Sequence, residues 1–253
     1  MVEALFWPAL LGYGEAAFAY ASARTSRAAT WGVRLGWLAQ TALLAAQAAG
    51  ADGFPWSSWA GSLNLFVWFV VGAYLIWGCR PRFRLLGLAV MPLAAALFLV
   101  ARIGGGTSAG VKSGYGSVFL VLHVGLVLAA FAGFTLAAAL AALYLWEEGR
   151  LKRRAADILR LRLPPLASLE RLTWRTIAVA LPLLTLGLAS GIIRQRERGG
   201  SLDALEAVTL VTWLVYGGFL ALRPTGRRAA YLALGGFALV IVARLVLAGS
   251  HFT

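Results

Sequence analysis

The sequence predicts an all-α membrane protein with about eight transmembrane helices, and three observations support this fold class. Of the 253 residues, 60% are hydrophobic and 13% are charged, whereas about a quarter of a typical soluble domain is charged. The apolar residues form runs of about 17 to 29, the length that a helix needs to cross ~30 Å of hydrocarbon. The charged residues lie mainly between these runs. We therefore expect residues 1–253 to form a single transmembrane helical domain.

Glycine, proline and arginine interrupt the apolar runs and so mark the expected spans. These spans lie near Ala4–Ala21, Trp31–Ala49, Ser62–Gly78, Leu85–Ala101, Val118–Trp146, Leu172–Ile193, Ala204–Leu222 and Ala229–Gly249. A second apolar run follows the first within about ten residues, which is not the pattern of a cleaved signal peptide. The first run is therefore expected to remain in the membrane.

The basic residues predict the orientation, because lysine and arginine near span ends are retained on the cytoplasmic side. The first, third, fifth and seventh connections hold 17 of the 23 basic residues, and the even connections hold five. We therefore expect both termini outside and a location in a bacterial cytoplasmic membrane. This topology accounts for the net charge of +13, so no nucleic-acid partner is expected.

The fifth connection is the longest of those expected in the cytoplasm, and it forms a basic segment at residues 147–171. Residues 147–163 have helical spacing, with apolar Leu151, Ile158 and Leu159 among cations. An amphipathic basic helix of this kind is expected to lie on the anionic inner leaflet. Alternatively, it binds a soluble cytoplasmic protein.

Two tryptophans, Trp56 and Trp59, lie in the second connection, which is expected outside. Tryptophan at this depth usually anchors a helix at the membrane interface. The same two side chains would also form a flat aromatic surface for a planar ligand. The residues alone leave both interpretations open.

Both histidines of the chain, His123 and His251, are expected at the outer face. His123 lies about one and a half turns into the fifth span, and His251 lies just beyond the eighth. Two imidazoles on one side of the membrane can act as axial ligands of one haem iron. A lone histidine is more often a hydrogen-bonded packing residue, so spacing alone leaves this alternative open.

Charges inside the spans are the next candidate feature, because Glu15 in the first span and Arg244 in the eighth are costly in lipid. Arg244 lies about two turns from His251, on roughly the same helix face. It would pair with a carboxylate such as a haem propionate, or it would form a structural ion pair with Glu15 or Glu206.

No nucleotide-binding loop, nucleophile elbow or zinc motif occurs in the sequence. The single cysteine, Cys79, is expected at a cytoplasmic helix end, and it permits neither an intrachain disulfide nor a thiolate cluster. We therefore do not expect an enzyme with its own catalytic machinery. A carrier or an accessory subunit is the expected class.

Eight segments of the chain form a recognisable set, namely Trp56–Trp59, Ser62–Trp68, Leu122–Val124, Leu143–Lys152, Leu169–Leu172, Val211–Tyr216, Gly235–Phe237 and Ser250–Phe252. They resemble the cytochrome c assembly protein family, in its short eight-span branch of CcsA-, HemX- and YpjD-like proteins. Together they are spread over nearly the whole chain. The family's tryptophan-rich outward loop is not matched, because residues 194–206 stand in its place and keep only the acidic spacing of Asp203 and Glu206.

The resemblance implies a protein that binds or transfers haem b at the outer face, or supports haem homeostasis, during cytochrome c biogenesis. His123 and His251 would then be the axial ligands, and Arg244 would be the propionate partner. Trp56 and Trp59 would contact the porphyrin. The implied partners are haem, the lipid bilayer, and an apocytochrome c or another maturation protein.

Two functions without haem remain open from the residues. A small-molecule transporter would use Glu15 and Arg244 as its coupling charges. A membrane scaffold would recruit a soluble enzyme through the basic segment 147–171.

Overall fold

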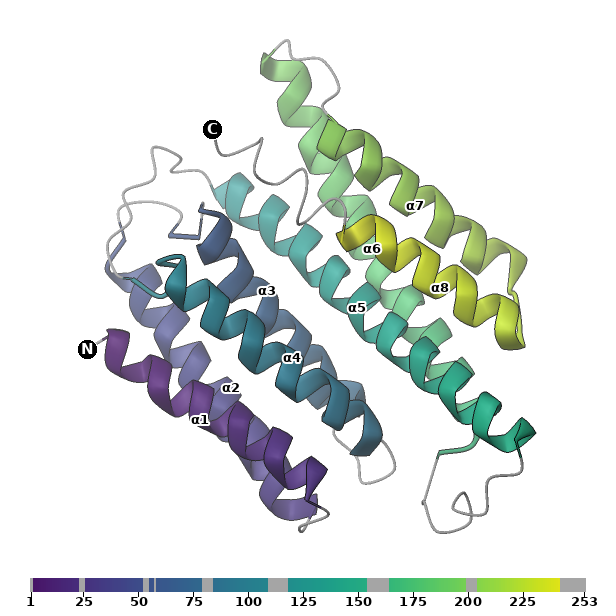
Figure 1. The fold of residues 1–253 in the computed structure, drawn as a ribbon. Helices are drawn as coiled ribbons and strands as arrows, with labels where there is room; N and C mark the ends of the chain where they lie inside the picture. The colour runs from purple at the N-terminus through teal and green to yellow at the C-terminus, as the bar shows by residue number, and fades with distance from the viewer. Residues whose placement is uncertain are drawn as a thin grey trace. The chain divides into compact units, whose positions relative to one another are not determined.

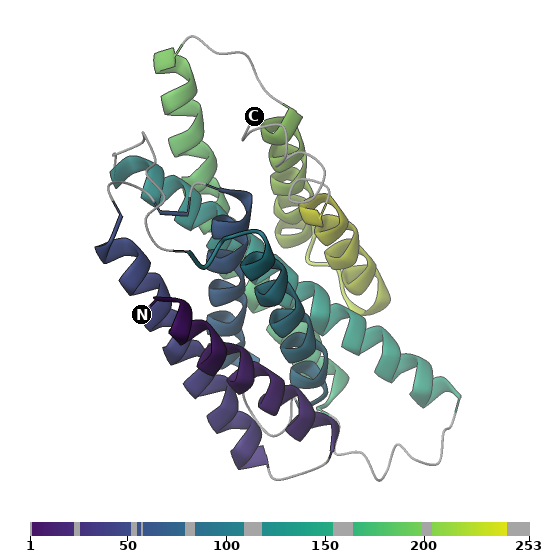
Figure 2. The same ribbon diagram turned by 60° about the vertical axis from the view of Figure 1, so that its left-hand side comes forward.

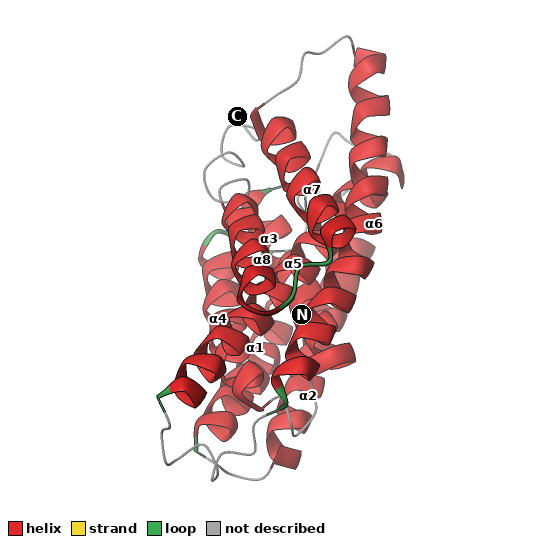
Figure 3. Cartoon of the chain, turned by 90° about the vertical axis from the view of Figure 1, so that its right-hand side faces the viewer, coloured by secondary structure: helices red, strands yellow, loops and turns green. Residues whose placement is uncertain are grey.

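The computed structural model describes residues 2–22, 26–51, 55–56, 58–78, 84–108, 118–153, 164–198 and 204–241. Within these ranges the ordered elements are all helical and no strand occurs, as Figure 3 shows. The α-helices are α1 (Val2–Ala21), α2 (Ser26–Ala49), α3 (Trp59–Ala73), α4 (Arg84–Ile103), α5 (Val118–Lys152), α6 (Leu166–Arg198), α7 (Ala204–Leu222) and α8 (Gly226–Ile241). The predicted all-α fold class is confirmed.

Four helical segments are long and apolar enough to cross a membrane, within the residues that the structure describes. They are Trp59–Ile76, Leu85–Ile103, Val121–Lys152 and Leu166–Ile193, and Glu206–Leu222 forms a shorter apolar helix. Each of the eight predicted apolar runs overlaps one described helix. The number of spans remains a prediction.

The helices group into two compact units, and α5 contributes to both because the division falls between Leu128 and Ala129. In the first unit, α1 packs against α2 and α4, and α3 packs against the same two helices. Figures 1 and 2 show α1 and α2 running side by side. A Cβ atom added to Gly12 would lie 2.7 Å from the Cα atom of Gly36. The close approach of α1 and α2 therefore depends on these glycines.

Two local signals determine where α3 begins and where α4 ends. The Ser58 hydroxyl accepts a hydrogen bond of 3.0 Å from the Gly61 N–H, which is the N-cap interaction that starts α3. At the end of α4, the Gly106 N–H donates to the Ala101 carbonyl oxygen at 2.7 Å, and Gly105 has a positive φ of 79°. This glycine-based C-cap turns the chain back over the end of the first unit.

In the second unit, α6 packs against α7 and α8, and α7 packs against α8. The ring of Tyr216 on α7 stacks on Phe134 of α5, with centroids 3.8 Å apart and an interplanar angle of 6°. The Tyr216 hydroxyl donates to the Ala233 carbonyl oxygen of α8 at 3.0 Å. This one buried side chain therefore joins three helices of the unit.

The structure differs from the predicted boundaries mainly where helices extend past the apolar runs. Helices α5 and α6 contain 35 and 33 residues, so each is about 50 Å long, well beyond ~30 Å of hydrocarbon. The ends of the predicted basic segment, residues 147–152 and 166–171, are thus extensions of these helices, and residues 154–163 lie outside the described ranges. Arg27, which lies between the expected first and second spans, is part of α2.

The third predicted span is also not a uniform α-helix. Helix α3 ends at Ala73, and a π-helix, η1 (Tyr74–Gly78), completes the span. The Tyr74 hydroxyl donates a hydrogen bond of 2.9 Å to the Tyr20 hydroxyl of α1. Hydropathy alone carries no information on this change of helix type.

Candidate functional site

The structure describes five of the eight predicted site residues. They are Glu15, Trp56, Trp59, His123 and Glu206. Arg244, His251 and Asp203 lie outside the described residues. The pairing of His123 with His251 around one iron, and the pairing of Arg244 with a propionate, therefore stay predictions.

His123 lies on the second turn of α5, in the part of that helix which belongs to the first unit. Its side chain is partly exposed. The position agrees with the prediction that His123 lies one to two turns inside the fifth apolar run.

Gln47 of α2 holds the Trp56 side chain and was not identified from the sequence. The Trp56 indole N–H donates to the Gln47 Oε1 atom at 3.1 Å, and the Asn64 amide of α3 donates to the same oxygen at 3.3 Å. The Gln47 amide donates to the carbonyl oxygens of Gly106 and Ser108 at 3.1 and 2.9 Å. One side chain thereby links two helices with the second and fourth connections, both of which are expected outside.

The hydrogen bonds continue from Asn64 toward the middle of the first unit. The Gln40 amide donates to both the side-chain and the main-chain oxygen of Asn64, at 2.9 and 3.0 Å. The Tyr13 hydroxyl of α1 donates to Gln40 Oε1 at 2.5 Å. We call this set the Gln47–Asn64 network, and its members are the side chains of Tyr13, Gln40, Gln47, Trp56 and Asn64 with the carbonyl oxygens of Gly106 and Ser108.

Residues 104–108 lie directly on the start of α3. A Cβ atom added to Gly106 would lie 2.2 Å from the Ala60 carbonyl oxygen, and one added to Gly104 would lie 2.5 Å from the Trp59 ring. Trp59 is 49% exposed, and Trp56 is half-buried. The two predicted tryptophans therefore lie at one end of the first unit, beside the segment 104–108.

A signal for this network was present in the sequence but was not used. Gln40 and Gln47 are seven residues apart in an apolar run, so they lie on one helix face, and Asn64 interrupts the next run. Amide side chains inside apolar helices usually bond across helices. Their partners depend on how three helices pack, and no local pattern predicts that packing.

The two predicted acidic residues that the structure describes have different surroundings. Glu15 is exposed on α1. Glu206 lies in the first turn of α7 and is half-buried, where a negative charge complements the helix dipole. Within the described residues, no group of three or more histidine, cysteine, aspartate or glutamate side chains is placed to hold a metal ion.

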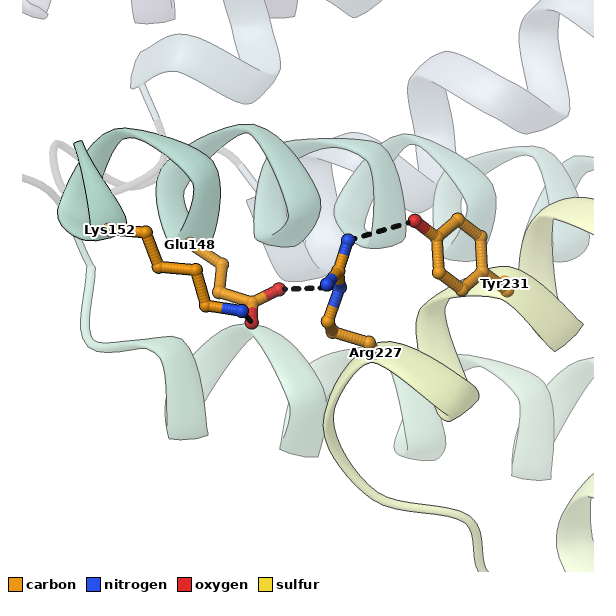
Figure 4. Close-up of polar contacts among 4 residues, drawn as sticks. All are labelled: Glu148, Lys152, Arg227 and Tyr231. Carbon is orange, nitrogen blue, oxygen red and sulfur yellow. Dashed lines mark hydrogen bonds and ion pairs between the residues drawn. The ribbon is translucent and has the colours of Figure 1, made fainter.

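A cluster of charged side chains lies at the end of α5 and the start of α8 in the second unit, and Figure 4 draws it. Glu148 of α5 pairs with Lys152 at 2.7 Å and with Arg227 of α8 at 3.4 Å. Arg227 in turn donates to the Tyr231 hydroxyl at 3.2 Å. This hydrogen bond, together with the nearby Glu148 carboxylate, raises the pKa of Arg227 above its ordinary value.

The start of α6 joins the same cluster through Glu170. The Gly226 N–H at the start of α8 donates to Glu170 Oε1 at 3.1 Å. Nearby, the Arg223 guanidinium lies 5.9 Å from the Trp174 ring centroid. The fifth and seventh connections therefore meet at one end of the second unit, as two connections on the same side of a membrane would.

We expect Glu170→Ala to lower the stability of the protein by about 1 kcal/mol, because it removes an acceptor for the first turn of α8. The thermal unfolding midpoint of the purified protein in detergent measures this effect. Glu170→Gln is the matched control, since it keeps the acceptor oxygen and removes the charge. An equal loss in both variants would assign the effect to charge and contradict the capping role.

The chain is similar to known proteins over most of its length. The family model described as cytochrome C assembly protein matches residues 56–250, a range that includes Trp56, Trp59 and His123 and ends one residue before His251. Cytochrome c biogenesis protein CcsA of Gloeothece citriformis is 29% identical over 273 residues, covering 85% of this chain and 83% of the relative. No solved structure matches the chain.

Two other relatives show how the matched share of this chain varies. CcsA of Picosynechococcus sp. is 28% identical over 308 residues, which covers 95% of this chain and 90% of the relative. That alignment is longer than the 253 residues of this chain, so the relative carries residues with no counterpart here. CcsA of Prochlorococcus marinus is 42% identical over 84 residues, or 30% of this chain and 27% of the relative. This integral membrane chain therefore belongs to the cytochrome C assembly protein family, as its sequence segments predicted.

Proposed function

We propose that the protein binds haem b at the outer face of a bacterial cytoplasmic membrane and carries or presents it during cytochrome c biogenesis. The observation that carries this proposal is the family match over residues 56–250. The relatives named for cytochrome c biogenesis, at 83 to 90% coverage of their own length, support the same process.

Three described residues support haem as the ligand. His123 is partly exposed, and Trp56 and Trp59 are aromatic residues beside the segment 104–108. In the proposed site His123 and His251 hold the iron, Arg244 pairs with a propionate, and the tryptophans contact the ring. Bound haem would supply an iron centre with two nitrogen ligands.

The proposed topology has eight spans with both termini outside. The meeting of the fifth and seventh connections in the second unit supports this arrangement, because both carry many arginines and lysines. The joining of the second and fourth connections through Gln47 in the first unit supports it as well. The end of the first unit that carries Trp56 and Trp59 would then face outward.

In this proposal the protein is a carrier or an accessory subunit. Covalent attachment of haem requires thiols, and Cys79 is the only cysteine of the chain. Those thiols would come from an apocytochrome c, with a maturation partner assisting. The basic segment 147–171 would lie on anionic lipid or bind a soluble cytoplasmic partner.

The transporter and the scaffold lack a specific observation in their favour. A coupling charge has to face a pathway for substrate or ions, and Glu15 is exposed on the surface of α1. The middle of the basic segment, residues 154–163, lies outside the described residues.

Absorption spectra of the purified protein, oxidised and reduced, test the proposal. We expect a Soret band, with sharp α and β bands after reduction, because two histidine ligands give a low-spin haem. The same preparation after addition of haem is the control for loss of haem during purification. A protein that stays colourless and takes up no added haem would contradict the proposed function.

A further inference from the structure

We infer that Gln47 and Asn64 position Trp56 as a stacking surface for a planar, apolar ligand. The inference rests on the proposed haem-binding function and names residues of that site that the sequence analysis did not include. Neither amide is placed in contact with the ligand. Gln47 acts through its bond to Trp56, and Asn64 acts through Gln47, so both are positioning residues.

The Gln47 side chain forms four hydrogen bonds, and these bonds fix the positions of Trp56, Asn64 and the segment 104–108. Its two N–H groups donate to Gly106 and Ser108, at 3.1 and 2.9 Å. Its oxygen accepts from Trp56 and Asn64, at 3.1 and 3.3 Å. A glutamine side chain can form about four such bonds, so its capacity is used in full. Gln47 is 2% exposed.

Asn64 connects Gln47 to Gln40 of α2, and through Gln40 to α1. It is fully buried, and its amide donates to Gly106 as well as to Gln47, at 3.1 and 3.3 Å. Its side-chain oxygen accepts from Gln40 at 2.9 Å. In an apolar helix bundle water does not replace a lost partner, so every member of the network constrains the others.

The network also fixes the direction of the Trp56 indole N–H, which is the only polar group of the tryptophan side chain and donates to Gln47. Trp56 is half-buried, and a ligand would meet the apolar ring of this side chain. Aromatic faces favour flat apolar partners, a chemistry that fits a porphyrin ring and does not fit a small polar solute.

Binding of metal-free protoporphyrin IX to the full-length protein in detergent tests this inference without using iron ligation. We expect Gln47→Leu to weaken binding about tenfold, because the Trp56 indole loses the acceptor that holds its ring in place. The matched control is Thr41→Val. It removes the acceptor of another indole, since Trp68 donates to Thr41 at 2.7 Å, away from both connections. We expect this variant to change binding less than about twofold.

A double-mutant cycle with Trp56→Phe separates positioning from a general loss of stability. If Gln47 acts through the Trp56 indole, Gln47→Leu should weaken binding in the Trp56→Phe background by less than about twofold. Asn64→Leu should behave like Gln47→Leu. Full additivity of the Gln47 and Trp56 effects, or an equal loss in Thr41→Val, would overturn the inference.

Comparison of the two ligands distinguishes this inference from the proposed function. If protoporphyrin IX binds with the expected dependence on Gln47 while the haem complex shows no histidine-ligated spectrum, the positioning role holds and haem ligation fails. If the wild-type protein binds neither ligand, both are overturned.

Discussion

Replacement of His123 by alanine is expected to abolish the reduced α and β bands and to reduce haem content at least about tenfold. An axial imidazole contributes a coordinate bond to the iron, and the chain contains only one other histidine, His251. We expect the same loss in His251→Ala if both residues ligate one iron. The measurement is the pyridine haemochrome content together with the oxidised and reduced spectra.

Val124→Ala is the matched control for His123→Ala. Val124 is the next residue of α5 and is also partly exposed, so its truncation tests local packing without removing a ligand. We expect this variant to keep its haem and its spectrum. Retention of the full spectrum in His123→Ala would show that His123 is a packing residue, the alternative that its spacing leaves open.

The substitution Gly106→Ala is expected to have the largest effect on stability, about 2 to 4 kcal/mol. The new Cβ atom would lie 2.2 Å from the backbone oxygen of Ala60, and a backbone atom cannot rotate away as a side chain can. The segment 104–108 would have to shift. The Gly106 carbonyl oxygen would then move away from the amides of Gln47 and Asn64, and both buried amides would lose a hydrogen-bond acceptor. The thermal unfolding midpoint of the protein in detergent measures the loss.

Gly14→Ala provides the control for this prediction. Gly14 is an exposed glycine inside α1, and a Cβ atom there meets nothing within 4 Å. Alanine favours the helix more than glycine does, by up to about 1 kcal/mol, so this variant should be unchanged or slightly more stable. Similar unfolding midpoints for Gly106→Ala and the wild type would contradict the close packing of the segment 104–108 on α3.

The fold class and the approximate helix positions follow from local chemistry, which is why the sequence predicted them. An apolar run of about 20 residues has to satisfy its own backbone hydrogen bonds in lipid, and a helix is the simplest way to do so. The prediction was least accurate where α2, α5 and α6 continue past their apolar runs. Arg27 and residues 147–152 are helical because charged residues extend a helix beyond the hydrocarbon at little cost.

The candidate site was predicted only in part. His123, Trp56 and Trp59 were identified from residue type, position and family resemblance, and these signals are local. Gln47 and Asn64 were missed, because their role is defined by Gly106 and Ser108, which are 59 and 61 residues away from Gln47 along the chain. Sequence spacing within one helix contains no information on such partners.

Hydropathy and basic-residue positions alone were therefore enough to predict a helical membrane chain, and the resemblance was enough to predict its family, which the family model confirms. The packing of α1, α2, α3 and α4 was needed to see that the Trp56 indole N–H points inward, to Gln47. The physical reason is that apolar burial is additive along the chain, whereas a hydrogen bond inside the protein requires two particular atoms to meet. Only the folded first unit brings those atoms together.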